Sequence, residues 1–208
     1  MGRTPGTRNA NYEMRRATLA EAALRAFLGP SGQPNSFRAI AQEIGEDPRT
    51  LRHYFGNADG LYQATFETLK ERSQRFRDEV LSRRDQGPLA ALTFYCQSMS
   101  TGWGYGMDRV FHVALACGLE NEVRGPVVIE HLFEPMLSVG EELFAYYAET
   151  GALDIRDPRM AAVSFLPPLL FALIHQDSLR GREVRPFDVQ GFIADHVDRF
   201  IAGRLPKA

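Results

Sequence analysis

Apolar residues recur every three to four positions along most of the chain, a spacing that predicts amphipathic helices. The first helix is predicted over 11–28, and the Gly-Pro-Ser-Gly run at 29–32 predicts a loop after it. From Leu89 onward the sequence has neither alternating apolar runs nor the Asn-Gly and Asp-Gly pairs of hairpins. The pattern therefore predicts an all-α protein of about nine helices.

Beyond residue 57 the helices are separated by Gly, Pro and Asp. They are predicted over 58–84, 88–101, 108–118, 126–149, 157–180 and 188–203. Two of them contain proline, at Pro135 and at Pro167-Pro168. Because proline lacks a backbone donor and clashes with the preceding turn, we expect both helices to be bent or split.

The interval 36–55 has the pattern of two short helices joined by a sharp turn. Ser36 is placed to cap the first helix. Gly45 stands where a helix commonly ends in a left-handed residue, and Asp47 with Pro48 forms a typical start for the second helix. The spacing predicts a helix-turn-helix.

In the second of these helices Leu51 and Phe55 lie four residues apart and are expected to point inward together. Polar and basic side chains are left on or near the outer face: Arg49, Thr50, Arg52, His53 and Tyr54. A short basic helix held by the helix before it is the form that enters a DNA major groove.

This interval resembles the helix-turn-helix of the TetR family of bacterial transcriptional repressors. The family pattern has Ser or Thr, an Ile-Ala pair, Gly at the turn, then Thr-Leu-Tyr-x-Tyr-Phe and a capped helix. The matching residues are Ser36, Ile40-Ala41, Gly45, Thr50-Leu51, Tyr54-Phe55 and Asn57. The resemblance spans residues 12 to 70. Glu46, Arg52, Gly56 and Ala58 stand where the family usually has a small apolar residue, Tyr, Pro and Lys.

The resemblance implies a sequence-specific DNA-binding regulator, a repressor that a small-molecule effector releases from its operator. It implies a homodimer on a palindromic, double-stranded operator. The expected domains are 1–57, an N-terminal arm with the helix-turn-helix, and 58–208, a connecting helix with an effector-binding and dimerisation body. The sequence fits a DNA-binding protein without an effector equally well.

The residues expected to contact DNA are Ser36, Arg38, Arg49, Thr50, Arg52, His53 and Tyr54. Arg49 and Arg52 lie three residues apart, on nearly the same helix face. Arginine is suited to bond guanine O6 and N7 together, so at least one of the two is expected to read a G·C pair. The alternative is that Arg52 meets phosphate or pairs with Glu46 or Asp47.

Charge is divided unevenly along the chain. Residues 1–84 hold 14 Lys and Arg against 10 Asp and Glu, a net of +4, whereas the whole chain has a net charge of −2. The split suits a nucleic-acid-binding head on an acidic body, although chance variation gives such splits too. Residues 1–10, with Arg3 and Arg8, fit either an arm that lies along DNA or a tail without a role.

The sequence offers little for catalysis or metal binding. It has no His-x-x-x-His, Cys-x-x-Cys or Gly-x-Ser-x-Gly, and the Gly-rich run at 102–106 lacks the spacing of a phosphate-binding loop. We therefore expect no enzyme, no metal and no cofactor. The alternative is an α-helical enzyme or ligand-binding protein with a coincidental helix-turn-helix, which would need a catalytic constellation.

Only two cysteines occur, Cys96 and Cys117, which fits a reducing compartment rather than a disulfide framework. The N-terminus lacks an apolar leader. The longest apolar run, 160–174, is shorter than the roughly 20 residues that a membrane span needs. The expected location is the cytoplasm, without a membrane partner.

The body is rich in aromatic residues, as small-molecule sites are, and its effector is expected to be apolar or aromatic. The candidate lining residues are Trp103, His112, Phe133, Phe165 and His175. Two segments near the C-terminus, 160–179 and 187–201, carry broad apolar faces. These faces are expected to pair with their copies in a four-helix dimer contact, or alternatively to form internal core. The side chains concerned are Leu166, Leu169, Leu170, Leu173, Ile174, Phe192, Ile193, Val197 and Phe200.

Overall fold

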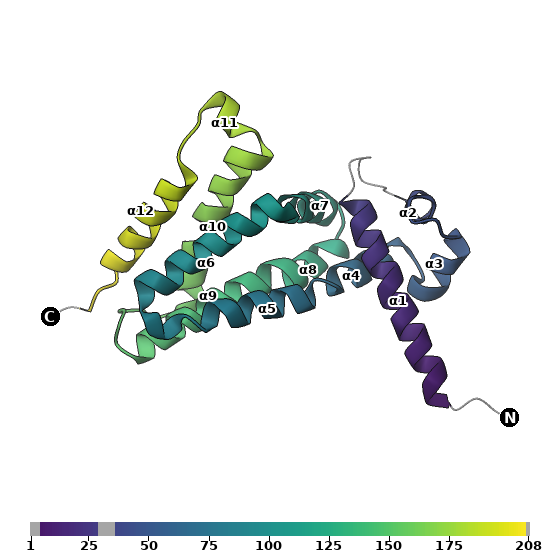
Figure 1. The fold of residues 1–208 in the computed structure, drawn as a ribbon, viewed down its shortest axis with the longest axis horizontal. Helices are drawn as coiled ribbons and strands as arrows, with labels where there is room; N and C mark the ends of the chain where they lie inside the picture. The colour runs from purple at the N-terminus through teal and green to yellow at the C-terminus, as the bar shows by residue number, and fades with distance from the viewer. Residues whose placement is uncertain (1–4, 29–35, 207–208) are drawn as a thin grey trace. The chain divides into compact units, whose positions relative to one another are not determined.

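The computed structural model describes residues 5–28 and 36–206. Every regular element within these two ranges is a helix, and no strand occurs there (Figure 1). The expected all-α class is confirmed. The contacts divide the chain into two compact units, of which unit 1 comprises residues 1–71 and 109–132 and unit 2 comprises residues 72–108 and 133–208.

Unit 1 contains the elements of the predicted helix-turn-helix together with later segments of the chain. Its helices are α1 (Pro5–Phe27), α2 (Phe37–Glu43), α3 (Pro48–Phe55), α4 (Ala58–Glu67), most of α7 (Asp108–Leu119), and α8 (Arg124–Val128) with most of the π-helical turn η3 (Ile129–Phe133). Residues 109–132 thus pack with the head, although the sequence assigned them to the body.

A single apolar cluster holds unit 1 together. Helix α1 contributes side chains at the spacing of one helix face, and α2, α3, α4 and α7 close around them. The members are Leu19, Ala20, Ala23, Phe27, Ile40, Ala41, Leu51, Phe55, Leu61, Ala64 and Val113. Leu51 is completely buried, and burial of such a side chain contributes about 2 kcal/mol. The inward pairing expected for Leu51 and Phe55 is confirmed.

Unit 2 is a bundle of the remaining helices. They are most of α5 (Lys70–Leu81), the 3-10 turn η1 (Arg84–Gln86), α6 (Pro88–Gly102), the π-helical turn η2 (Trp103–Met107), α9 (Glu134–Glu149), α10 (Pro158–Leu173), the π-helical turn η4 (Ile174–Ser178), α11 (Gly181–Val184) and α12 (Val189–Ala202). Helices α9 and α10 lie side by side, and α12 packs on α6 and α10 (Figure 1).

A glycine and a group of aromatic side chains explain the tight contact between α9 and α10. A Cβ atom on Gly140 of α9 would lie 3.3 Å from the Cβ of Ala162 on α10, so the glycine lets the two backbones come together. Beside this contact the rings of Phe144 and Phe165 meet at a centroid distance of 5.6 Å, and Phe200 of α12 lies 4.7 Å from Phe165. These aromatic side chains form the centre of unit 2.

The single helix expected over 58–84 is wrong, because α4 ends at Glu67 and α5 begins at Lys70. Two threonine hydroxyls mark the break. Thr65 Oγ1 donates to the Leu61 carbonyl at 2.8 Å, and Thr68 Oγ1 donates to the Thr65 carbonyl at 2.6 Å. Such bonds add a second donor to helix carbonyls and commonly bend or end a helix.

Helix starts and proline positions differ from expectation in three places. Helix α1 begins at Pro5 rather than at residue 11, and proline suits a first helical position because its missing donor is not needed there. The predicted helix 126–149 is not split, because α8, the π-helical turn η3 and α9 follow one another without a gap, with η3 just before Pro135. Helix α10 also continues through Pro167 and Pro168, and the irregular turn comes later, at η4. The expected loop at 29–32 and residues 1–4 of the expected arm lie outside the described residues.

One helical stretch, Pro158–Ser178, is long and apolar enough to cross a membrane by length and composition, at 21 residues and a mean hydropathy of 1.3. The expectation that this apolar segment is too short to span therefore does not hold for the helix as a whole. Its side chains at Phe165, Leu166 and Leu169 are buried inside unit 2. The core helix of a soluble protein passes the same test, so this is weak evidence for a span.

Candidate nucleic-acid interface and ligand cavity

The turn between α2 and α3 is a Schellman motif. Gly45 has a φ of +70°, its amide donates to the Gln42 carbonyl at 3.3 Å, and the Glu46 amide donates to the Ala41 carbonyl at 2.8 Å. This pattern satisfies helix-end carbonyls and needs a left-handed residue, which glycine adopts without strain. The predicted role of Gly45 is confirmed.

Both helices begin with the caps that the sequence predicts. Ser36 Oγ accepts from the Ala39 amide at 3.2 Å at the start of α2. Asp47 Oδ1 accepts from the Arg49 amide at 2.7 Å at the start of α3, where Pro48 occupies the first position. Each cap satisfies an amide that has no partner inside its own helix.

The outer face of α3 carries the basic residues expected to contact DNA. Arg49, Arg52 and His53 are exposed, and Thr50 and Tyr54 are half-buried. Arg38 and Ser36, at the start of the preceding helix, are exposed as well. No ion pair joins Arg38, Arg49 or Arg52 to a residue that the structure describes. Their guanidinium groups therefore remain available.

The two carboxylates weighed as partners of Arg52 are engaged elsewhere. Glu46 Oε1 lies 2.5 Å from Nη2 of Arg15 on α1, and Asp47 caps α3. This ion pair also gives a physical role to the unusual Glu46 at the turn, since it ties the turn to α1.

Helix α1 braces the outer face of α3 through residues that the sequence analysis did not single out. The Tyr12 ring lies 4.7 Å from the Tyr54 ring and 5.9 Å from the His53 ring, and the Tyr12 hydroxyl donates to the Tyr54 carbonyl at 3.5 Å. Tyr12 and Arg15 lie seven and four residues before Leu19, on the stripe that packs into the core. That spacing is the signal that would have placed them next to α3.

The chain leaves α3 through a γ-turn at Gly56. Its φ is +75° and its ψ is −66°, and the Asn57 amide donates to the Phe55 carbonyl at 2.8 Å. This turn requires a positive φ, which proline cannot adopt because its ring holds φ near −65°. Gly56 stands where the TetR pattern usually has proline, and it therefore forms a turn that proline could not form.

The γ-turn directs the Phe55 carbonyl at the first turn of α4. A Cβ atom on Gly60 would lie 2.2 Å from the Phe55 oxygen, far inside van der Waals contact. The Gly60 amide meanwhile donates to Asn57 Oδ1 at 2.9 Å, which is the predicted cap of α4. Gly60 is therefore the residue that allows α3 and α4 to pack this closely.

Helix α4 is fixed from its other side by α7 and α8. Arg124 Nε lies 2.7 Å from Asp59 Oδ1, and its guanidinium carbon lies 5.2 Å from the centre of the Tyr62 ring. The Tyr62 hydroxyl donates to the Ala114 carbonyl at 3.5 Å, and burial raises the pKa of Tyr62, so this hydroxyl keeps its proton. Burial also raises the pKa of the Cys117 thiol, although Arg124 opposes the shift.

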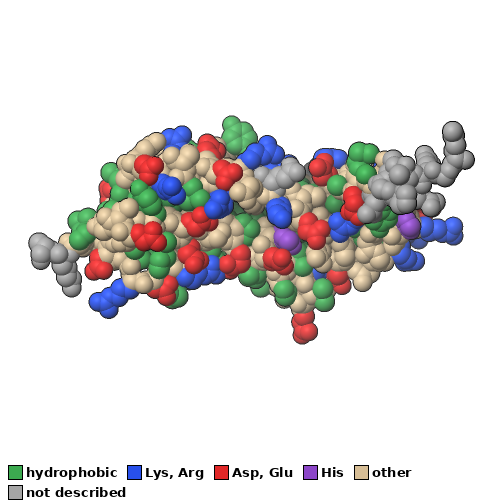
Figure 2. Space-filling model, turned by 90° about the horizontal axis from the view of Figure 1, so that it is seen from below, with side chains coloured by type: hydrophobic (Ala, Val, Ile, Leu, Met, Phe, Trp, Pro, Cys, Tyr) green, Lys and Arg blue, Asp and Glu red, His purple; other side chains and the backbone are tan. Residues whose placement is uncertain are grey.

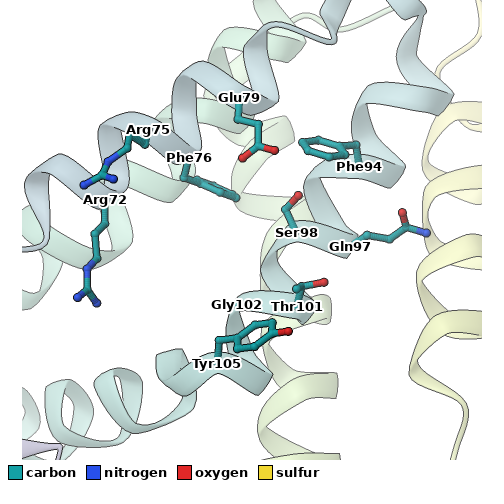
Figure 3. A pocket seen from close by; sticks show the side chains of 10 residues that line it. All are labelled: Arg72, Arg75, Phe76, Glu79, Phe94, Gln97, Ser98, Thr101, Gly102 and Tyr105. Atoms are coloured by element: carbon teal, nitrogen blue, oxygen red, sulfur yellow. The ribbon is translucent and has the colours of Figure 1, made fainter.

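Unit 2 contains an open cavity of about 640 Å³ between α5 and α6 (Figure 3). Its lining residues come from one face of α5 and from one face of α6 that continues into η2. They are Arg72, Arg75, Phe76, Glu79, Phe94, Gln97, Ser98, Thr101, Gly102 and Tyr105.

None of the five residues predicted to contact an effector lines this cavity. Trp103 is buried, Phe165 is completely buried in the aromatic centre of unit 2, and Phe133 is half-buried. His175 is half-buried beside Gln176, at 2.8 Å between its Nδ1 and the amide nitrogen, and His112 is exposed and belongs to unit 1. The structure thus does not bring the five together at this cavity.

Charge and metal ligands give no further site. On the face shown in Figure 2, acidic and basic side chains are interspersed over the molecule. In the part of the chain that the structure describes, no three His, Cys, Asp or Glu residues are grouped in a way that could hold a metal ion. Among the residues that the structure describes, the helix-turn-helix and the cavity in unit 2 are the candidate sites that these observations support.

Together the helices define an all-α protein with an N-terminal helix-turn-helix. Its fold is that of TetR-family regulators of known structure. A Rhodococcus regulator assigned to this family superposes with a TM-score of 0.72 at 16% identity, over 90% of this chain and 99% of that one. A TetR transcription regulator from Haloarcula marismortui gives 0.69 at 14% identity, over 93% and 100%. The transcriptional regulator FadR from Bacillus subtilis, in complex with stearoyl-CoA, gives 0.56 at 14% identity, over 91% and 98%.

No protein-family model matches the sequence, and a comparison with curated proteins gives no match. At these identities the likeness establishes the fold.

Proposed function

We propose that the protein is a sequence-specific DNA-binding transcriptional regulator, a cytoplasmic repressor that a small effector releases from its operator. The observation that carries the proposal is the exposed basic face of α3, with Arg49 and Arg52 unpaired among the described residues and both helix caps in place. A rigid helix that presents free guanidinium groups is suited to base edges in a major groove. The shared fold with TetR-family regulators supports the same function.

Binding to a randomised double-stranded DNA library tests this function directly. The purified protein should select a palindromic sequence, and its affinity should fall steeply with salt. Each phosphate that the protein neutralises adds about 0.9 to the slope of log K against log salt concentration. If no member of the library is retained even at low salt, the protein is not a DNA-binding regulator.

We propose further that the protein acts as a homodimer, but through residues other than those first expected. Leu166, Leu169 and Val197, among the side chains expected to pair between copies, are completely or almost completely buried within unit 2, so they are internal core. The outer face of α10 instead exposes an apolar stripe at helical spacing, consisting of Met160, Val163, Pro167, Pro168 and Phe171. Apolar stripes of this kind are buried between the two copies of a two-fold dimer.

Charge placed on this stripe should therefore separate the copies. Phe171, which is 67% exposed, can change to Glu without opening the core. Because a carboxylate at the centre of an apolar contact is costly to bury, Phe171→Glu should shift the protein to a monomer of 23.4 kDa at micromolar concentration in sedimentation velocity. Leu119→Glu, at an exposed leucine of α7, is the matched control and should leave the dimer intact. A wild-type protein that sediments as a monomer rejects the dimer.

The effector is the third part of the proposal. FadR, which shares the fold, was solved with stearoyl-CoA. The cavity in unit 2 has a volume within the range of about 300–1,000 Å³ that small-molecule sites occupy. We propose that a ligand in this cavity lowers the affinity of the dimer for its operator. The measurement is operator affinity with and without the ligand, once the selected DNA sequence is in hand.

A further inference from the structure

The cavity of unit 2 is built from two helical faces of different character. On α5 the lining residues lie at positions i, i+3, i+4 and i+7, which share one helix face. They are Arg72, Arg75, Phe76 and Glu79. The facing stripe of α6 and η2 brings aromatic rings, at Phe94 and Tyr105, and hydroxyl and amide groups between them. In the view of Figure 3 both arginines lie toward one end and Phe94 toward the other, with Phe76 between them.

We propose that this cavity binds a small amphipathic monoanion, in which one carboxylate or sulfonate is joined to an aromatic or aliphatic body. The inference rests on the proposed function in that this ligand would be the effector. It adds one negative charge to the apolar or aromatic effector that the sequence indicated.

The charges around the cavity favour one anionic group rather than several. Arg72 and Arg75 supply two positive charges, and Glu79 supplies one negative charge on the same face. The next arginine along α5, Arg77, is engaged by Glu142, with its Nη2 at 2.6 Å from Oε2, and it does not line the cavity. The lining residues thus carry a net charge of +1, which a monoanion neutralises, and Arg83 over the Phe94 ring adds a further positive charge beside the cavity. A ligand with several phosphates would meet the Glu79 carboxylate as well.

The guanidinium groups are suited to an oxyanion. Arg72 is exposed and forms no ion pair with a described residue, so binding an anion there does not break an existing contact. Arginine presents planar, paired donors that match the two oxygens of a carboxylate or the oxygens of a sulfonate. Two arginines three residues apart can contact the same group.

The rest of the cavity is suited to an apolar body. The Phe94 ring is covered on one side by the Arg83 guanidinium, 3.9 Å from the ring centre, and lines the cavity as well. Tyr105 is 89% exposed at the cavity, so a ligand that covers its ring removes apolar surface from water. Gly102 also lines the cavity and brings no side chain to it.

A matched pair of fluorescent probes tests the charge preference. Anilinonaphthalene sulfonate is a monoanion with two aromatic groups, and phenylnaphthylamine has the same ring framework without the sulfonate. Both increase in fluorescence when they leave water for an apolar site. The wild-type chain is expected to bind the sulfonate probe saturably, with one site per chain, and about tenfold more tightly than the neutral probe.

Variants at the arginines separate an anion site from a merely apolar surface. Arg72→Gln combined with Arg75→Gln should weaken the sulfonate probe about tenfold and leave the neutral probe unchanged, since only the charged contacts are lost. Arg156→Gln removes an exposed arginine of unit 2 that does not line the cavity, and it should change neither probe. Glu79→Gln should tighten the sulfonate probe about threefold because it removes a like charge.

A variant that fills the cavity locates the probe. Ser98→Trp places a large ring in the cavity and should abolish binding of both probes, with circular dichroism as the check that the helices remain. Should that variant unfold, competition with decanoate and with its uncharged amide tests the charge preference instead, because decanoate should displace the sulfonate probe at a lower concentration than the amide does, and the arginine variants then locate the probe. The inference is overturned if the arginine variants leave the sulfonate probe unaffected, or if they weaken both probes equally.

These measurements need no DNA, so they separate the inference from the proposed function. Probe binding with the expected charge dependence, in a protein that selects no DNA, would reject the regulator and keep the anion site. Selection of a palindrome by a protein whose arginine variants bind the sulfonate probe as the wild type does would keep the regulator and reject the anion site.

Discussion

Gly60→Ala is expected to destabilise unit 1 by about 3 kcal/mol, at the upper end of the cost of adding a methyl group to a packed site. The new Cβ atom would lie 2.2 Å from the Phe55 carbonyl oxygen. That oxygen belongs to the backbone at the γ-turn and cannot rotate away as a side chain would. In an ordinary helix position the same change would stabilise the helix by up to about 1 kcal/mol, so the expected sign is reversed.

The matched control is Gly104→Ala, because a Cβ atom at Gly104 has no atom within 4 Å and its φ is not positive. This variant should be neutral or slightly stabilising. Amide hydrogen exchange is the suitable measurement, since it reports the free energy of opening for each unit separately. The slow amides of α3 and α4 should exchange faster in Gly60→Ala alone. Equal exchange in Gly60→Ala and the wild type would show that the turn relaxes without cost.

Replacement of the two arginines on α3 should have the largest effect on DNA recognition. Arg49→Ala or Arg52→Ala is expected to cost about 1–3 kcal/mol in operator affinity and to relax the preference at one base-pair position in each half-site. The reason is that both guanidinium groups are exposed and unpaired with the carboxylates near them, which are held by Arg15 and by the cap of α3. Binding-site selection with each variant measures the preference at every position.

Arg38→Ala is the contrasting variant, because Arg38 lies on α2 and is expected to contact phosphate. It should weaken all sequences alike and lower the salt slope by about 0.9. If Arg49→Ala and Arg52→Ala behave in this way too, and the selected sequence keeps its full preference at each position, neither arginine reads a base.

The helix-turn-helix was predictable because its signals are local. A cap acts on an amide two or three residues away, as Asp47 does for Arg49, and Gly45 ends its helix through bonds to residues just before it. Such rules apply within one turn of chain and need no knowledge of the rest of the fold. These local rules did not predict the γ-turn at Gly56, because glycine is compatible with many types of turn.

The cavity of unit 2 was predicted less well, because an aromatic residue on an apolar face has the same sequence pattern whether it lines a cavity or fills the core. Phe165 was a candidate for an effector contact and is instead completely buried against Phe144 and Phe200. The lining arginines lie in a segment for which the sequence predicted only a helix, over 58–84. What makes them a site is the facing stripe of α6, and sequence spacing does not reveal which helix faces another.

Unit 1 closes its core with a segment that the chain reaches only after the first part of unit 2, residues 72–108. Val113 belongs to the apolar cluster, Arg109 Nη1 donates to the Leu28 carbonyl at 3.0 Å, and Arg124 holds Asp59. During synthesis, therefore, the helix-turn-helix helices α2 and α3 emerge from the ribosome before the residues that complete their packing. Contacts of such long sequence separation form late. A nascent chain that stops before residue 109 should therefore leave unit 1 only partly folded.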